Sequence, residues 1–275
     1  MWKKAVTRFI NAAESPVLRT EFDAMSSRSL NVKTPLGPFL ACNPFPRGWT
    51  DGLFYREKMR AIHRVAPAAI DANARILEIG GGRSGMASYL YRGANITTLD
   101  IDPVLGGQQP ESARGDFVCA DARNLPFPDE CFAVVTLFDV LEHIEEDSVA
   151  VQEALRVTRK AGYVLVSAPH AGWHYPYYPA MQRVCPHELE LMREWGHVRR
   201  GYSHADLALL FGDAPQTFAT FINPVTAFFH DVAFSRLRRR RRMMLYAAAA
   251  LPTAIAYTLH GRSTQGTETA FAWRR

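Results

Sequence analysis

The sequence has little cysteine and no long apolar run at its start. None of its four cysteines, Cys42, Cys119, Cys131 and Cys185, forms a C-x-x-C pair, which argues against a zinc site or a disulfide framework and suits a reducing compartment. The first fifteen residues, MWKKAVTRFINAAES, lack the continuous apolar segment of a secretory signal. We therefore expect a cytoplasmic protein.

Net charge is also small outside one short segment. The 275 residues carry a formal net charge of +5, but six arginines at positions 236 and 238–242 contribute +6, so the rest of the chain is near neutral at −1. Hydrophobic residues make up 48% of the chain, which is enough for a sizeable core and excludes disorder by composition. No internal repeat is visible.

Alternating strand and helix patterns predict an α/β fold. Strands are expected at 75–79, 95–100, 115–119, 132–138 and 162–168, with helices between most of them, the clearest at 146–160. Such alternation is typical of a parallel sheet with helices on both faces. We expect the chain to have two parts: an N-terminal helical and loop cap over 1–66, and a main domain over 67–275.

The cap and the C-terminal third have their own signals. An amphipathic helix is expected from residue 1 to about 20, a loop over 31–50 and a helix over 53–66, ending before Pro67. Ser203 and Asp206 form a capping box that opens a helix at 204–211. A strand at 216–222, a basic and apolar helical insertion at about 224–262 and a final strand, TETAFAWRR, complete the main domain.

The segment RILEIGGGRSG, residues 75–85, predicts a nucleotide site. Gly80, Gly82 and Gly85 follow a buried strand with the G-x-G-x-x-G spacing that lets a backbone approach a cofactor. Glu78 stands two residues before the first glycine, where it would repel the pyrophosphate of NAD but could meet the ammonium and sulfonium groups of S-adenosylmethionine. The acid therefore favours S-adenosyl-L-methionine as cofactor.

Further residues at strand ends are assigned to the same cofactor site. Asp100 follows Gly80 by 20 residues, where an acid can accept hydrogen bonds from ribose hydroxyls. Asp121 follows the next strand and is expected to accept from the adenine amino group, with Phe138 flanking the ring. Ile101 and Ala122, which follow the two acids, complete the assignment.

Four segments resemble successive motifs of a known family. ILEIGGGRSG, TTLDID, CADARNLPFPDECFAVV and LFDVLEHI are similar to the motifs of class I S-adenosylmethionine-dependent methyltransferases, in the type-11 group. The resemblance covers about 70–170, and the D-A-x-x-L-P-F-P-D-E run is its most specific part. It implies a Rossmann-like sheet of seven strands whose last strand, TETAFAWRR, is antiparallel. The chain departs from the family in having Ser84 where glycine is frequent.

Two histidines at the active edge of the sheet are candidate catalytic bases. His143 lies just past the fourth strand and His170 ends the fifth, and ligands of open α/β sheets bind beyond the carboxyl ends of strands. His174, Tyr175 and Tyr177 follow on a loop and are predicted to contact the substrate. The alternatives are that His143 packs against the following helix and that the loop forms a packed aromatic corner.

One acidic and histidine pattern resembles a metal-binding motif. Asp139, Glu142 and His143 form a D-x-x-E-H pattern, similar to the E-x-x-E-H cluster with which some O-methyltransferases bind a divalent ion. Many type-11 relatives have the E-H pair without a metal, so the prediction is no metal. His187, His197 and His204 are interpreted as surface or capping residues, and Arg47 and Trp49 as residues that could reach over the cofactor.

The segment SRLRRRRRMMLYAAAALPTAIAYTL allows three interpretations. The arginines, Arg236 to Arg242, could bind an anionic membrane surface, could be solvated beside a buried helix, or could bind nucleic acid. The apolar stretch 243–259 has 17 residues and contains Pro252, whereas a membrane-spanning helix needs ~20 residues. We favour a peripheral membrane surface, and nucleic acid is unlikely because no aromatic residues are interleaved with the arginines.

The sequence therefore predicts a cytoplasmic S-adenosylmethionine-dependent methyltransferase, peripheral on the inner membrane face. The expected reaction is O-methylation of a lipid, a lipid-linked sugar or another amphipathic small molecule. One alternative is a soluble methyltransferase of a sugar or secondary metabolite. Another is a non-catalytic S-adenosylmethionine-binding protein that docks a partner through its arginines.

Overall fold

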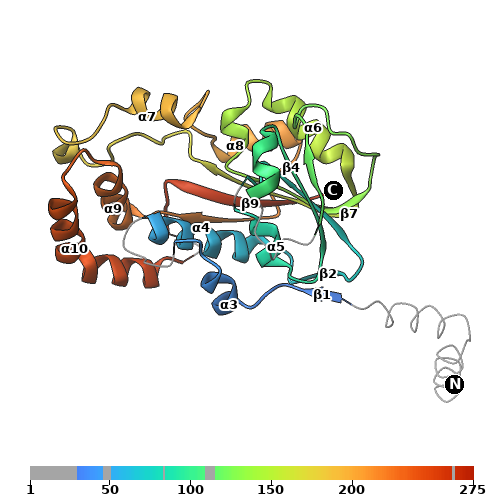
Figure 1. The fold of residues 1–275 in the computed structure, drawn as a ribbon, viewed down its shortest axis with the longest axis horizontal. Coiled ribbons are helices and arrows are strands. Elements are labelled where there is room, and N and C mark those ends of the chain that lie inside the picture. The colour runs from blue at the N-terminus through green and yellow to red at the C-terminus, as the bar shows by residue number, and fades with distance from the viewer. Residues whose placement is uncertain (1–29, 46–50, 83, 109–114, 262–263) are drawn as a thin grey trace, which may run out of the picture.

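The computed structural model describes residues 30–45, 51–82, 84–108, 115–261 and 264–275. The helix predicted over residues 1 to about 20, and Arg47 and Trp49, lie outside these ranges. The described chain is built around one large sheet, with helices on both of its faces and a group of three helices at one end (Figure 1).

The large sheet has seven strands in the order β5-β4-β3-β6-β7-β9-β8. They are β3 (Arg75–Ile79), β4 (Asn95–Asp100), β5 (Phe117–Cys119), β6 (Phe132–Phe138), β7 (Thr158–Pro169), β8 (Thr217–Phe221) and β9 (Glu268–Arg274). Strands β3 to β7 pair in parallel, and β9 is antiparallel to both of its neighbours. The predicted α/β class, the seven strands and the antiparallel last strand are confirmed.

Two layers of helices bury the faces of the sheet. On one face, α4 (Asp51–Val65) and the short α5 (Met86–Leu90) enclose a core with side chains such as Ile76, Val134 and Leu165. On the other face, α6 (Asp147–Val157) and α8 (His204–Phe211) pack over the alternate side chains of the same strands. Successive residues of a strand point to opposite faces of the sheet. A central strand that is buried on both faces therefore has a nearly continuous run of apolar residues in its sequence.

Three helices form a separate apolar cluster beside the sheet. These are α7 (Glu188–Trp195), α9 (Pro224–Phe234) and α10 (Arg239–Leu259), which pack with the loop that follows β7. The remaining elements are β1 (Leu30–Val32), which pairs with β2 (Ala69–Asp71), and α3 (Leu36–Ala41). The described part of the chain also contains the 3-10 turns η1 (Pro103–Gln108), η2 (Leu141–His143) and η3 (Pro179–Met181).

Some ends of helices and strands lie where the sequence predicts them, and others do not. The capping box of α8 forms, with Ser203 accepting from the Asp206 amide and Asp206 accepting from the Ser203 amide. The helix predicted over 146–160 ends at Val157, because Thr158 already pairs with Phe132 and β7 begins there. Helix α10 starts inside the arginine run, earlier than the apolar stretch at 243, and α3 and α7 were not predicted.

Candidate active site

The glycine turn after β3 has the left-handed backbone that its sequence predicts. Gly80, Gly82 and Gly85 have φ values of +64°, +48° and +52°, a region that side chains with a Cβ rarely occupy. A Cβ on Gly80 would also lie 2.4 Å from the Cγ2 atom of Val140. The turn therefore requires glycine both for its conformation and for the close approach of the chain after β6.

A cavity of about 590 Å³ opens beside this turn, at the carboxyl ends of β3, β4 and β6. Its lining comes from the glycine turn, the ends of these strands and the segments that follow them. The lining residues are Ile79, Gly80, Leu99, Asp100, Ile101, Ala120, Asp121, Ala122, Arg123, Asp139, Val140, His143, Ile144, Glu145 and Val198. We call this space the first cavity.

Asp100 joins the wall of the first cavity to the glycine turn. Its Oδ2 atom accepts a hydrogen bond of 3.2 Å from the Gly82 amide, and its Oδ1 atom accepts one of 3.1 Å from the Asp102 amide. The carboxylate is thus oriented by the backbone at the end of β4. Gly80, Asp100, Ile101, Asp121 and Ala122, all predicted cofactor residues, line the first cavity.

The other four predicted cofactor residues do not line the first cavity: Gly82 and Gly85 belong to the glycine turn beside it, and Glu78 and Phe138 lie elsewhere. Glu78 is buried beneath the turn, where its Oε1 atom accepts from the Ala87 amide at 3.1 Å, and it does not line the cavity. Burial raises the pKa of Glu78 to about 7, although hydrogen bonds from the start of α5 favour its ionised form. Phe138 packs against the core on the α4 face instead of flanking the cavity, because its neighbour Leu137 takes the opposite face of β6.

Asp121 lines the cavity but is engaged by a neighbour. The Arg123 guanidinium donates to both of its carboxylate oxygens at 3.0 Å from Nε, and this lowers the pKa of Asp121. Arg123 also pairs with Glu146. A ligand that used the Asp121 carboxylate would therefore share it with Arg123.

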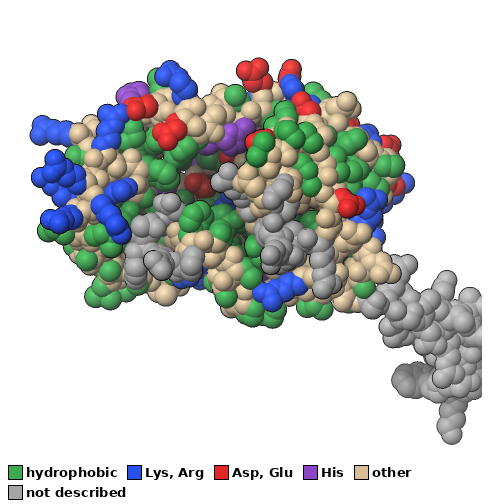
Figure 2. All heavy atoms as spheres, in the orientation of Figure 1, with side chains coloured by type: hydrophobic (Ala, Val, Ile, Leu, Met, Phe, Trp, Pro, Cys, Tyr) green, Lys and Arg blue, Asp and Glu red, His purple; other side chains and the backbone are tan. Residues whose placement is uncertain are grey.

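A second cavity of about 400 Å³ adjoins the first, and Asp139 and His143 line both. It lies between the sheet and the cluster of α7, α9 and α10, and Figure 2 shows histidine and acidic side chains in the hollow there. Its lining is rich in aromatic side chains. The residues are Phe45, Phe54, Tyr55, Lys58, Asp139, Glu142, His143, Pro169, Trp173, Trp195, His197, Phe221, Ile222, His230, Phe234 and Glu268.

Asp139 is held in place where the two cavities meet. It has a φ of +53°, which is uncommon for aspartate, and its carboxylate accepts from Lys58 of α4 and, at 2.5 Å, from the Ser167 hydroxyl of β7. Burial is the largest effect on the pKa of Lys58 and lowers it, but the charge and hydrogen bond of Asp139, together with the charges of Tyr55 and Glu268, raise that pKa to about 12. The ion pair therefore ties α4 to the ends of β6 and β7.

His143 and His197 meet across the second cavity. The Nδ1 atom of His143 lies 3.1 Å from the carbonyl oxygen of Gly196, the residue that ends α7 with a φ of +75°. The carbonyl requires a donor, so Nδ1 carries the proton and Nε2 keeps its lone pair. The His197 ring stands edge-on to the His143 ring, with centroids 4.8 Å apart.

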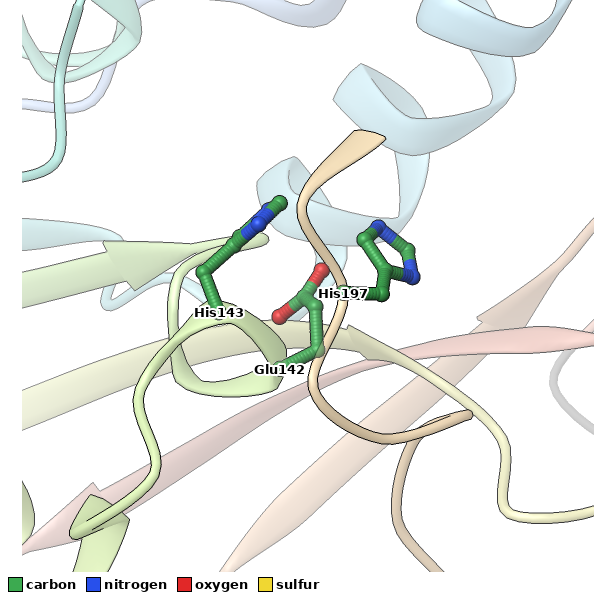
Figure 3. A group of neighbouring side chains, drawn as sticks. All are labelled: Glu142, His143 and His197. Carbon is green, nitrogen blue, oxygen red and sulfur yellow. The ribbon is translucent and has the colours of Figure 1, made fainter. Parts of the chain in front are cut away.

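Glu142 lies between these two rings, as Figure 3 shows. Glu142 is 1% exposed, and neither carboxylate oxygen has a hydrogen-bond partner among the residues that the structure describes. Burial, and then the charge of Asp139, raise the pKa of Glu142 well above its ordinary value. Burial also lowers the pKa of His197 to about 4, with His143 adding to the effect, so that ring is neutral near pH 7.

The other predicted catalytic and substrate residues lie outside both cavities. The His170 Nδ1 atom accepts from the Gly172 amide at 3.0 Å. Tyr175 is buried and donates to the Asp231 carbonyl at 3.2 Å, while the Tyr177 amide donates to the Asp231 carboxylate. His174 packs edge-on against Tyr177. The structure thus favours the packed aromatic corner, because α9 supplies the acceptors that hold this loop.

Sequence reasoning missed several residues of the second cavity. His197, interpreted as a surface residue, lines it together with Trp173, Trp195 and Glu268. The sequence W-G-H at 195–197 contains one usable signal, since a glycine after an apolar run marks a helix end. Nothing in the local sequence connects that helix end with His143. His187 does cap α7, as interpreted.

Comparison with known proteins places the central part of the chain in a family. Residues 77–166 match the family described as methyltransferase domain. A probable phthiotriol/phenolphthiotriol dimycocerosates methyltransferase 2 of Mycobacterium ulcerans is 39% identical over 107 residues, which cover 37% of this chain and 42% of that protein. A fatty-acid O-methyltransferase of Mycolicibacterium smegmatis is 32% identical over 127 residues, 44% of this chain and 46% of that protein. The chain thus spans less than half the length of these two relatives.

Other matches agree on the family but not on the acceptor. A demethylmenaquinone methyltransferase of Renibacterium salmoninarum is 33% identical over 123 residues, 43% of this chain and 52% of that protein. Among solved structures, a methyltransferase of Thermotoga maritima described as a possible histamine N-methyltransferase has a TM-score of 0.51 at 16% identity, over 79% of this chain and 87% of that one. That similarity concerns the fold. Residues 77–166, about a third of the chain, thus match a methyltransferase domain, and this match supports the class I S-adenosylmethionine-dependent methyltransferase of the type-11 group that the motifs predict.

Proposed function

We propose that this protein transfers a methyl group from S-adenosylmethionine to a hydroxyl oxygen of an amphipathic acceptor, such as a lipid or a lipid-linked sugar. The observation that carries the proposal is the junction of two cavities of different character. The first adjoins the glycine turn and Asp100, and the second is largely aromatic. They meet at Asp139 and His143, so a donor in one and an acceptor in the other would face each other there.

The residues of the first cavity fit S-adenosylmethionine. Asp100, oriented by two backbone amides, would accept from the ribose hydroxyls. Ile101 and Ala122 offer apolar surface for the adenine ring, and the glycine turn lets the backbone approach the ligand. When bound, this cofactor supplies an electrophilic methyl group on a sulfonium.

The residues at the junction would position the acceptor and take its proton. Methyl transfer is accelerated mainly by holding the two reacting atoms in line. The bound cofactor would supply the methyl group, and the electron pair of its carbon–sulfur bond would stay on sulfur as the acceptor oxygen bonds to the methyl carbon. The hydroxyl proton would pass to the Nε2 atom of His143, which has a free lone pair because Nδ1 faces the Gly196 carbonyl.

The second cavity favours an acceptor with a large apolar part. Aromatic side chains from α4, α7, α9 and the loop after β7 line it, and aromatic rings contribute large apolar contact areas. Asp139 and His143 lie at the junction with the first cavity, and Glu142 and His197 lie beside His143. An acceptor would therefore place its hydroxyl at the junction and its apolar part among the rings.

Helix α10 presents an apolar stripe to solvent, which supports a membrane location for this chemistry. Met244, Leu251, Ile255 and Leu259 are 71%, 71%, 50% and 75% exposed, and their spacing of seven, four and four residues places them along one side of the helix. The opposite side is buried, with the Tyr246 ring stacked on Phe229 at 5.1 Å. We call the four exposed residues the α10 outer face; its length is about 22 Å at 1.5 Å per residue.

Positive charge lies at one end of the α10 outer face. Arg238 to Arg241 are exposed at the start of α10, a helix with no acidic residue in its first turn, and within the described residues they form no ion pair with an acidic side chain. The helix N-terminus is itself positive, so arginines there are unfavourable unless an anion binds. Figure 2 shows basic side chains gathered over this end of the molecule.

An anionic lipid surface complements both features. Phosphate head groups would meet the arginines while the α10 outer face enters the boundary between head groups and acyl chains. Among the described residues, no helix is both long enough and apolar enough to cross a bilayer. We therefore propose peripheral attachment, which would place the second cavity near a supply of amphipathic acceptors.

The test uses purified protein, methyl-labelled S-adenosylmethionine, and separate lipid and aqueous fractions of a cell extract. We expect label in the lipid fraction, in a form that hydriodic acid releases as methyl iodide, as a methyl ether requires. Label in the aqueous fraction alone would favour a soluble sugar or metabolite acceptor. Label that resists hydriodic acid would indicate carbon methylation. Cofactor binding without transfer to any fraction would favour the non-catalytic alternative.

A further inference from the structure

We infer that Glu142, His143 and His197 form a binding site for a first-row divalent metal cation such as Zn²⁺, at the junction of the two cavities. The three side chains offer one carboxylate oxygen and two imidazole nitrogens that all lie within 4.8 Å of one another. Glu142 and His143 come from the 3-10 turn after β6, and His197 follows α7. Figure 3 shows the carboxylate between the two rings.

The distances require only a small adjustment. Bonds from Zn²⁺ to nitrogen or carboxylate oxygen are about 2.1 Å long, so two ligands of one ion are at most about 4.2 Å apart. The present separations exceed that limit by less than about 1 Å. His143 is exposed to the cavities and can turn toward the ion, while the backbone is already fixed, since the Val198 amide donates to the Glu142 carbonyl at 3.0 Å.

The protonation pattern of the ligands suits a cation. The Gly196 carbonyl holds the proton of His143 on Nδ1, which is the outer hydrogen bond that metal-binding histidines usually make, and leaves the lone pair of Nε2 available to a metal ion. Among the residues that the structure describes, the Nδ1 atom of His197 and both oxygens of Glu142 are buried and have no hydrogen-bond partner. Buried polar atoms without partners are costly, and a metal ion would give a Glu142 oxygen a partner.

The charge of the surroundings points the same way. The second cavity is lined by three acidic residues, Asp139, Glu142 and Glu268, and by one basic residue, Lys58. Asp139 itself is not offered as a ligand, because Lys58 and Ser167 already bind its carboxylate. The D-x-x-E-H pattern therefore supplies two ligands, and the third comes from His197.

The ligand atoms, two imidazole nitrogens and one carboxylate oxygen, indicate which metal ion is expected. Imidazole favours zinc and other later first-row metals, whereas Mg²⁺ prefers oxygen ligands. Two histidines and one glutamate also leave coordination positions open, as in catalytic zinc sites. An acceptor oxygen could occupy one of these positions. In the metal-bound protein Nε2 of His143 would be a ligand, and the acceptor proton would pass to water in the open cavity; this last role rests on the proposed function.

The experiment measures metal binding directly. Protein freed of metal with a chelator is titrated with Zn²⁺, Co²⁺ and Mg²⁺ by calorimetry, and tryptophan emission is followed with Co²⁺. We expect one Zn²⁺ per chain, binding at least 100-fold more tightly than Mg²⁺. Co²⁺ should quench the emission, because the Trp195 and Trp173 rings lie 5.5 Å and 6.4 Å from the His197 ring.

Three variants locate the ion. His197→Ala and Glu142→Gln should each weaken Zn²⁺ binding at least 100-fold, and His174→Ala, a histidine outside both cavities, should leave it unchanged. Glu142→Gln keeps the shape of a buried side chain, so its fold should be retained, as circular dichroism would verify. Zn²⁺ binding that is absent, that survives both variants, or that gives the thiolate charge-transfer band of cobalt on one of the four cysteines would overturn the inference.

Activity separates the site from the proposed function. Methyl transfer that continues undiminished in the metal-free protein would overturn the role for acceptor binding. One Zn²⁺ bound at these residues, with no methyl transfer to any fraction, would instead contradict the proposed function and support the site.

Discussion

Replacing Arg238, Arg239, Arg240 and Arg241 with glutamine removes four exposed positive charges from the start of α10. Each basic residue near an anionic membrane surface contributes ~1 kcal/mol. The four together therefore contribute ~4 kcal/mol, and their loss should weaken binding to anionic vesicles by about 10³-fold. The fold should be unaffected, because these side chains form no ion pair with another described residue.

The assay is sedimentation with vesicles of neutral phosphatidylcholine, with or without anionic phosphatidylglycerol. Binding of the wild-type protein should require the anionic lipid and should fall as salt rises, because the Debye length shrinks from ~10 Å at 0.1 M to ~3 Å at 1 M. A double variant of the α10 outer face, Leu251→Ser with Leu259→Ser, should also weaken binding. Burying a leucine is worth ~1.5–3 kcal/mol, and that contribution is not screened by salt.

Arg236→Gln is the matched control. Arg236 already pairs with Glu190 at 2.6 Å, so its loss removes less free positive charge and should change vesicle binding by much less than the fourfold replacement. Methyl transfer to a water-soluble acceptor should be the same in all these variants. Equal sedimentation with neutral and anionic vesicles, or none with either, would refute the reasoning. Tight RNA binding in the same buffer would instead support the nucleic-acid alternative.

Three further predictions concern the cofactor, the base and a buried acid. Asp100→Ala should weaken S-adenosylmethionine binding by ~1–3 kcal/mol in calorimetry; unchanged affinity, or tight binding of NAD, would contradict the assignment. His143→Ala should lower turnover by ~10²–10⁴ with cofactor affinity nearly intact, whereas His170→Ala, outside both cavities, should stay within a few-fold of wild type. Burial raises the pKa of Glu57 to about 8 from 4.5, against the opposing effects of Thr226 and Arg60. Between pH 4.5 and 8 the folded state therefore keeps a proton that the unfolded state has lost. The free energy of unfolding consequently falls as the pH rises from 4.5 to 8. Glu57→Gln should raise the thermal midpoint at pH 8 and leave it nearly unchanged at pH 4; an equal gain at both would refute the shift.

Much of the sheet and the glycine turn could be predicted because their signals are local. Strands β3, β4 and β6 begin and end at the predicted residues, because a strand pattern beside turn residues depends only on neighbours in the chain. The same holds for the capping box of α8. The predicted boundary between α6 and β7 was wrong. Thr158 pairs with Phe132 of β6, and this pairing overrides the helical pattern of the local sequence.

The first cavity was also largely predictable, since its residues lie at strand ends. Parallel strands bring their carboxyl ends to one edge of the sheet, so Gly80, Asp100 and Asp121 had to lie near one another. The direction of a side chain at such an end is less certain. Phe138 turns to the α4 face, and Glu78 turns beneath the glycine turn.

The sequence by itself determined the class of fold, the order of most of its elements and the edge of the sheet at which the first cavity lies. Only the tertiary structure decided the second cavity. Lys58 reaches Asp139 across 81 residues, and His143 meets the end of α7 across 53. No local pattern encodes such contacts, because they arise when separate helices pack on the same edge of a sheet. The pairing of His143 with His197, and the burial of Glu142 between them, are therefore properties of the folded chain alone.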